Sequence, residues 1–136
     1  MEFTVNQALK KAIEAHKSCQ IQEADRLYTA ILEAQPKHPD SNHNIGVLAV
    51  GLGKVEQALP FFNTALEANA SIAQFWLSYI YAFIKLNKVA DAKSVFEQAK
   101  SKGAKGGWVE QIAVRLENVA KIAGNQADED ILGKAL

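Results

Sequence analysis

Two adjacent segments decide the fold of this chain: SNHNIGVLAVGLG at residues 41–53 and VEQALPFFNTALEAN at residues 55–69. The first carries the small residues Gly46 and Ala49. In the second, a small alanine lets two helix axes approach closely, and the aromatic residue one turn later fills the space where the axes diverge. Gly53 ends the first segment and tolerates the left-handed backbone of a tight turn, so the stretch predicts two packed helices. The apolar face of the second helix consists of Val55, Ala58, Leu59, Phe62, Ala65 and Leu66, which recur at helical spacing.

The same pattern recurs every 34 residues along the chain. Three windows, 5–38, 39–72 and 73–106, align without a gap, and each repeats an alanine that is followed four residues later by an aromatic residue. A fixed self-similarity of this length predicts stacked helical hairpins, whereas an ordinary helical bundle would show it only by chance. The recurring slots hold Cys19, Gly53 and Asn87; Ile21, Val55 and Val89; Ala24, Ala58 and Ala92; Tyr28, Phe62 and Phe96; and Ile31, Ala65 and Ala99.

These slots resemble the tetratricopeptide repeat (TPR) family over residues 5–106. The resemblance implies an all-α fold, a right-handed α-α superhelix (TPR solenoid) of helix-turn-helix repeats that binds other chains. It rests on Gly46, Ala49, Ala58, Phe62 and Ala65 in the second window, on Ala24, Tyr28 and Pro36 in the first, and on Trp76, Ala92, Phe96 and Ala99 in the third. The chain departs from the family pattern at Lys11, Ile80, Phe83, Ala70 and Ala104, which changes the packing expected between helices but not the fold.

We expect a single domain over residues 1–123, made of the three repeats and a capping helix at 107–123. The apolar stripe of that helix would cover the face that the last repeat exposes, a role favoured over that of a free amphipathic partner helix. The remaining residues, 124–136, are acidic and then apolar, and a short helix, a disordered end and a linker all remain open for this tail. The stripe consists of Trp108, Ile112, Leu116, Val119 and Ile122.

Local signals mark where several helices begin. Thr4 and Gln7 have the spacing of a capping box, in which each side chain binds the other's backbone N–H. Pro39 suits the first turn of a helix, and Ser71 is a candidate cap for the fifth helix. Pro60 removes one backbone donor inside the fourth helix and predicts a bend there.

Composition and charge narrow the function classes. Fifteen basic and fifteen acidic residues cancel, which argues against a nucleic-acid surface or an anionic-membrane surface. No stretch of 18 uncharged apolar residues exists, so no membrane insertion is expected. Cys19 is the single cysteine and suits a reducing compartment, and the first residues, MEFTVNQALKK, lack the apolar run of a signal peptide. We therefore expect a cytoplasmic protein.

A search for catalytic or metal-binding residues favours a non-enzymatic chain without metal or cofactor. No phosphate-binding glycine loop, H-E-x-x-H or C-x-x-C motif occurs. His38 and His43 flank one helix start and His16 lies near the end of a different helix, so the three do not have metal-ligand spacing. Cys19 lies three residues after His16, but a nucleophilic thiol needs an activating base and this pair is a common coincidence.

The TPR resemblance implies a concave groove lined by the first helix of each repeat. Several apolar side chains would face that groove, which suggests an interaction site, although helix curvature could instead tuck them between repeats. The apolar strip consists of Leu9, Ile13, Val47, Val50, Leu77, Tyr81 and Ile84. The remaining groove positions are Asn6, His16, Asp40, His43, Asn44 and Gln74.

One well-known TPR mode grips the terminal carboxylate of a peptide with Lys, Arg and Asn side chains. That chemistry needs cations aimed into the groove. The slots that would hold them carry Leu9, Ile13, Gln74 and Ser78, and only Asn44 matches. We therefore predict no carboxylate clamp.

The leading hypothesis is an interaction scaffold that binds a peptide or helix of a partner protein in the groove. A variant is self-association, in which the groove or the DEDILGKAL tail engages a second copy. A hypothesis of another class is that the chain is the N-terminal targeting part of a larger enzyme, glycosyltransferase-like or sulfotransferase-like.

Overall fold

The computed structural model describes the backbone of residues 3–135 and the side chains of residues 3–122. Every element in this part of the chain is an α-helix, as the sequence predicted. The helices are α1 (Val5–Lys17), α2 (Ile21–Ala34), α3 (Pro39–Gly51), α4 (Val55–Ala68), α5 (Ala73–Lys85), α6 (Val89–Ser101) and α7 (Gly107–Ala135).

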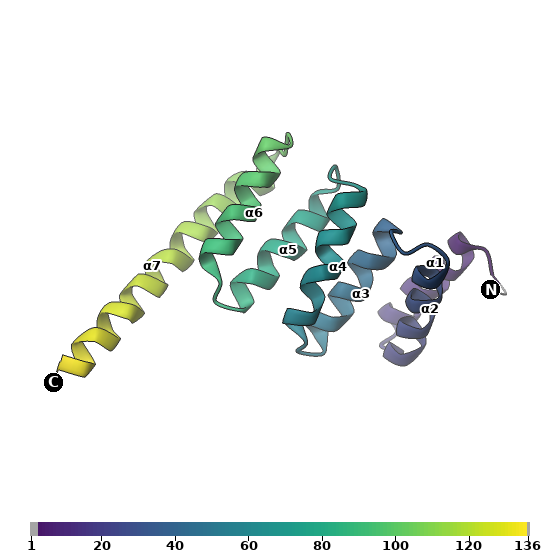
Figure 1. The fold of residues 1–136 in the computed structure, drawn as a ribbon, viewed down its shortest axis with the longest axis horizontal. Helices are drawn as coiled ribbons and strands as arrows, with labels where there is room; N and C mark the ends of the chain where they lie inside the picture. The colour runs from purple at the N-terminus through teal and green to yellow at the C-terminus, as the bar shows by residue number, and fades with distance from the viewer. Residues whose placement is uncertain (1–2, 136) are drawn as a thin grey trace.

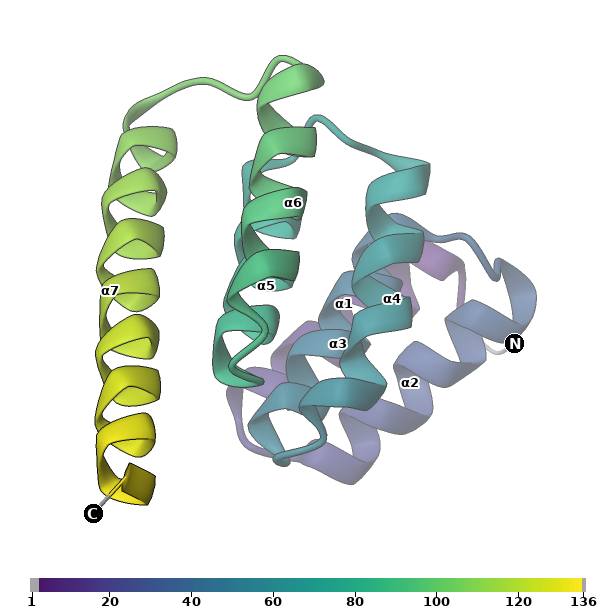
Figure 2. The same cartoon turned by 60° about the vertical axis from the view of Figure 1, so that its left-hand side comes forward.

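The helices form three hairpins in a row, followed by a final helix (Figure 1). Each helix packs against the next one along the chain, and α3 also contacts α5 directly. That contact between the first helices of two successive repeats creates an inner layer, on which a groove can form. Figure 2 shows α7 standing beside the last hairpin.

The turns inside the three hairpins share one backbone geometry. Their central residues are the equivalent Cys19, Gly53 and Asn87, with φ angles of 59°, 78° and 58°. In each turn the following residue donates its N–H to the carbonyl four positions before the turn residue, at 2.8–2.9 Å. This bond satisfies a carbonyl that the helix end would leave without a donor, and it requires the left-handed conformation predicted for these slots.

The recurring alanine and aromatic slots form the contacts within the hairpins. All three alanines and Ile31, Ala65 and Ala99 are fully buried, and the aromatic residues Tyr28, Phe62 and Phe96 are nearly so. Apart from Ile31, these positions divide among core clusters that follow one another along the chain. The periodic residues therefore hold the scaffold together.

Helix starts agree with the sequence at one predicted cap and differ at another. The Gln7 N–H donates to Thr4 Oγ1 at 3.1 Å, and the Thr4 N–H donates to Gln7 Oε1 at 3.0 Å, which confirms the capping box. Ser71 does not cap α5, because its N–H and hydroxyl both donate to Asn69 Oδ1. The N-cap of α5 is Ile72, which has no side chain able to accept.

Helix α7 is longer than the segment 107–123 and continues to Ala135, past the last repeat (Figure 1). Ile112 and Leu116 are buried against the core of α5 and α6, as expected for a capping role. Ile122 is 57% exposed, so the predicted stripe does not pack along its whole length. Side chains 123–136, which include the whole predicted tail, lie outside the described residues.

Candidate partner-binding groove

The structure brings part of the predicted apolar strip together in one cavity. Val47 and Val50 of α3 and Tyr81 and Ile84 of α5 line a cavity of about 310 Å³. Its other lining residues are Phe62 from α4, Ser78, Ala82 and Lys85 from α5, and Arg115 from α7. The lining is therefore mostly apolar and comes from two repeats and the final helix.

Phe62 reaches this cavity because Gly46 has no side chain. A Cβ built on Gly46 would lie 2.5 Å from Phe62 Cε1 and 2.8 Å from Cδ1, closer than real Cβ atoms come. Removing the Cβ lets the aromatic ring of α4 press between α3 and α5. One ring thus serves the core and contributes to the wall of the cavity.

The remaining predicted groove residues are distributed differently. Leu9 packs against the cluster of α1 and α2, and Leu77 against the cluster of α5, α6 and α7, so each is half-buried in a core. Tyr81 is 40% exposed. The other half-buried members are Ile13, His16, Asn44, Val47, Val50 and Ile84, while Asn6, Asp40 and Gln74 are exposed.

His43 is a structural link and not an open groove residue. Only 7% of its surface is exposed, and its ring stacks on Phe75 with centroids 4.7 Å apart. Its Nε2 lies 2.7 Å from Ser78 Oγ and its Nδ1 3.1 Å from Asn44 Oδ1. Burial lowers the pKa of His43 below 6.5, and the Asn44 contact and the charge of Asp40 partly oppose that shift. The neutral ring thereby joins α3 to α5 beside the cavity.

Two positively charged side chains, Lys85 and Arg115, line the cavity, and neither was predicted from the sequence. The Arg115 guanidinium lies over the Tyr81 ring, 5.1 Å from its centroid, in a cation–π contact. Lys85 is exposed, and the lining contains no Asp or Glu. Arg115 lies 34 residues after Tyr81, so extending the repeat period into the last helix would have placed it on the inner face.

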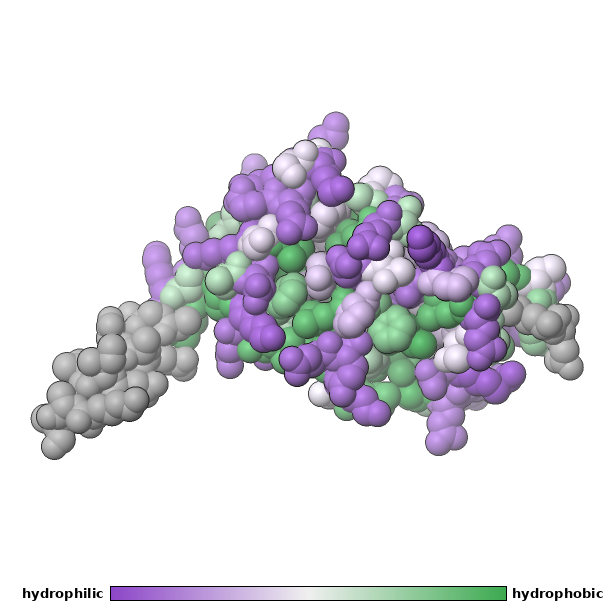
Figure 3. Space-filling view, in the orientation of Figure 1, coloured by the Kyte–Doolittle hydropathy of each residue, from purple (hydrophilic) through white to green (hydrophobic). Residues whose placement is uncertain are grey.

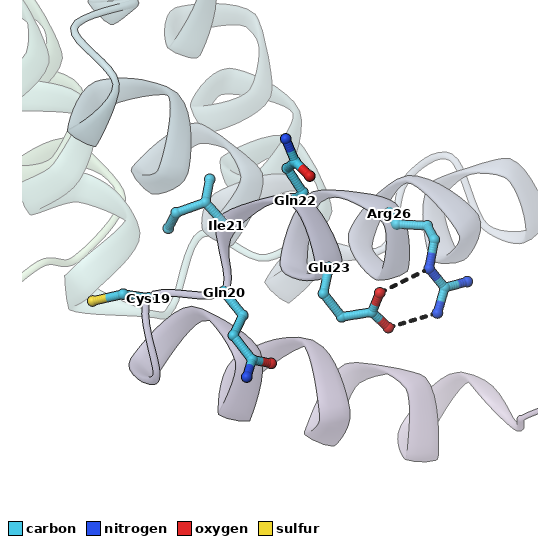
Figure 4. A pocket seen from close by; sticks show the side chains of 6 residues that line it. All are labelled: Cys19, Gln20, Ile21, Gln22, Glu23 and Arg26. Carbon is cyan, nitrogen blue, oxygen red and sulfur yellow. Dashed lines mark hydrogen bonds and ion pairs between the residues drawn. The ribbon is translucent and has the colours of Figure 1, made fainter.

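A second hollow lies at the turn between α1 and α2 but is broad and shallow (Figure 4). Glu23 and Arg26 bind each other there through two hydrogen bonds of 3.0 and 2.6 Å. The Arg26 hydrogen bond lowers the pKa of Glu23. Cys19 is exposed and points away from this pair, while the His16 ring lies edge-on to Tyr28.

The surface around the repeats is mixed. Figure 3 shows hydrophobic residues gathered over the middle of one face, bordered by hydrophilic ones. Among the described residues, no group of three or more His, Cys, Asp and Glu side chains could hold a metal ion. No helix in the described part of the chain is both long and apolar enough to cross a membrane.

A family model for the tetratricopeptide repeat matches residues 9–71 and 43–106, which together span most of the chain. The chain belongs to the tetratricopeptide repeat family. The seven helices of the described residues accordingly form three TPR hairpins and one final helix. A search of curated protein sequences finds no match.

Solved TPR structures share the fold at low identity. The first TPR domain of human RPAP3 is 20% identical with a TM-score of 0.76, covering 89% of this chain and 95% of that one. The TPR2B domain of yeast Sti1, in complex with pHsp70, is 18% identical with a TM-score of 0.70, covering 90% and 97%. The Yersinia enterocolitica chaperone SycD, in complex with a peptide of the translocator YopD, is 12% identical with a TM-score of 0.71, covering 90% and 93%.

Proposed function

We propose that this TPR chain is a non-enzymatic scaffold that binds a peptide or helix of a partner protein in its concave, largely apolar groove. The observation that carries the proposal is the cavity between α3, α5 and α7, with Phe62 and Tyr81 in its wall. An apolar cavity open to solvent on a repeat scaffold favours the docking of an apolar side chain. Neighbours of the same fold include SycD in complex with a peptide of YopD and the Sti1 domain in complex with pHsp70, which supports an interaction function.

The cavity is an anchor point within a longer contact. Burying one large apolar side chain there contributes about 1.5–3 kcal/mol. Micromolar binding requires about 8 kcal/mol in total. The partner segment must therefore also contact other positions along the groove, and the exposed Gln74 and half-buried Asn44 offer amide groups for this purpose.

The proposal is tested by capture of partners from the source organism. The chain with Tyr81→Asp places a charge in the cavity wall without removing a core side chain, because Tyr81 is partly exposed. The matched control is Leu52→Asp, since Leu52 is 54% exposed and lies outside the cavity lining. Partners retained by the wild type and by Leu52→Asp, and lost by Tyr81→Asp, support the groove.

Two measurements keep the result interpretable. Thermal unfolding followed by circular dichroism must show that both variants fold like the wild type. Identical sets of partners for the wild type and a folded Tyr81→Asp variant would show that the cavity does not take part in binding.

A further inference from the structure

The charge of the cavity specifies its occupant more closely than its apolar wall does. Lys85 and Arg115 line it, no acidic residue does, and within residues 3–122 neither cation belongs to an ion pair. The cations come from α5 and α7, two different helices. An occupant with an apolar side chain and more than one carboxylate would complement this lining in both shape and charge.

The chain itself carries such a segment. Residues 128–132 read DEDIL, three acidic residues followed by two large apolar ones. No other run of three acidic residues occurs in the sequence. The segment is therefore a close chemical complement of the cavity.

The geometry of α7 directs this segment to another molecule. Arg115 and Asp128 belong to the same continuous helix, Gly107–Ala135. At 1.5 Å per residue, the helix carries Asp128 about 20 Å away from the Arg115 end of its own cavity. While α7 stays helical, the DEDIL segment cannot fold back into that cavity.

We infer that the cavity receives the DEDIL segment of a second copy of the chain, with Ile131 or Leu132 against Phe62 and Tyr81 and the carboxylates beside Lys85 and Arg115. This inference rests on the proposed function, since it names one partner for the same groove. An exchange of segments between two copies would occupy two cavities, and its ionic part would weaken in salt.

Sedimentation velocity of the 136-residue chain at several concentrations tests the inference. The wild type should form dimers that weaken as the salt concentration rises. The cavity variant Lys85→Glu/Arg115→Glu and the tail variant Asp128→Lys/Asp130→Lys should each raise the dimer dissociation constant about tenfold or more, because two attractive pairs become repulsive. The control Lys93→Glu/Lys102→Glu makes the same charge change on exposed residues away from the cavity and should dimerise like the wild type.

The decisive experiment mixes the cavity variant with the tail variant. Each contact in the mixed pair joins opposite charges again, so an equimolar mixture should dimerise although neither variant does alone. A mixture that stays monomeric would overturn the inference, and so would a wild type that is monomeric at about 1 mM. Monomers whose tail contacts their own cavity, seen by paramagnetic labelling of the tail, would also overturn it.

These failures are separate from failure of the proposed function. A monomeric chain whose captured partners still depend on Tyr81 would lose the self-docking inference and keep the scaffold. A chain that dimerises as inferred but captures no partner through Tyr81 would restrict the groove to self-association.

Discussion

Single residues determine whether the hairpins close and whether the cavity has its aromatic wall. Gly46 and Phe62 are in close contact, because the Phe62 ring occupies the space that a Cβ on residue 46 would need. Cys19 and Asn87 take the left-handed conformation that Gly53 has at the same position of the second repeat. His43 fills a buried polar position between α3 and α5. Single substitutions at Gly46, Cys19 and His43 test the role of each side chain or backbone conformation.

Gly46→Ala should destabilise the protein by about 1–3 kcal/mol, because the added methyl overlaps the buried Phe62 ring and a packed core relaxes only partly. The control is Gly51→Ala in the same helix, where nothing lies within 4 Å of the new Cβ. There alanine should be neutral or stabilise by up to about 1 kcal/mol. Urea unfolding gives both values, and equal effects of the two substitutions would contradict the close contact.

Cys19→Gly should stabilise the chain by about 0.5–1 kcal/mol, since the φ of 59° is strained for a residue with a Cβ and free for glycine. Ser18→Gly is the neighbouring control at φ −88°, where glycine should only destabilise. Thermal unfolding of both variants under reducing conditions measures the difference. A loss of stability in Cys19→Gly would show that the thiol makes an unrecognised contribution.

The stability of the chain should fall as the pH drops below about 6.5. Burial lowers the pKa of His43 in the folded state, so between that pKa and 6.5 the unfolded chain binds more protons. The contribution is complete above pH 6.5, is lost as the pH falls toward the folded pKa, and changes no further below it. Urea unfolding from pH 5 to pH 8 should show a smaller slope in His43→Gln than in the wild type. Parallel curves would mean that His43 is not the titrating group.

Among the elements, α7 takes the position of the first helix of a further repeat. Val114 lies 34 residues after Ile80, in the slot also occupied by Ala12 and Gly46. Those three positions are buried, whereas Val114 is 58% exposed, because no second helix follows α7 in the described residues. Ile112 points the other way, into the core of the third repeat. The helix therefore closes the solenoid with one face and leaves the opposite face open.

Two substitutions on α7 test this orientation. Ile112→Ala should cost about 2–5 kcal/mol, as expected when a buried aliphatic side chain is truncated and leaves a cavity. Val114→Ala, two residues further along on the opposite, open face, should change stability by less than about 0.5 kcal/mol. Chemical denaturation measures the free energy of unfolding of both variants. A large loss of stability in Val114→Ala would show that another element covers that face.

At the scale of the molecule, the groove differs in charge from that of a carboxylate clamp. The slots that would carry clamp cations hold Leu9, Ile13, Gln74 and Ser78, and the two cations of the cavity come from Lys85 and Arg115. Ser78 is also committed to a hydrogen bond with His43. The cations therefore serve a different place on the inner face from the clamp positions.

Acidic peptides with a free C-terminus should consequently bind no better than the same peptides with an amidated C-terminus. A clamp would make amidation cost about tenfold or more, because charge-assisted hydrogen bonds to the terminal carboxylate would be lost. Fluorescence titrations of matched free and amidated peptides measure the ratio. Micromolar binding that depends on the free terminus would contradict the absence of a clamp.

The residue pattern alone predicts the repeat, the turns and the buried slots. Alanine, aromatic and turn residues recur because each hairpin solves the same local packing problem, and a local solution is visible in a 34-residue period. The same local logic failed at Ser71, where Asn69 competes for the hydroxyl and N–H, and at Ile122, which packing leaves exposed.

Which inner-face residues meet depends on how the helices pack against one another in space. His43 is buried, Leu77 is half-buried and Tyr81 is partly open, a difference that spacing alone does not reveal. Phe62 of α4 reaches the cavity because Gly46 leaves room for its ring. Arg115 reaches it because α7 continues the inner layer. Periodicity fixes contacts within a repeat, while the surface offered to a partner depends on how successive repeats are rotated against one another.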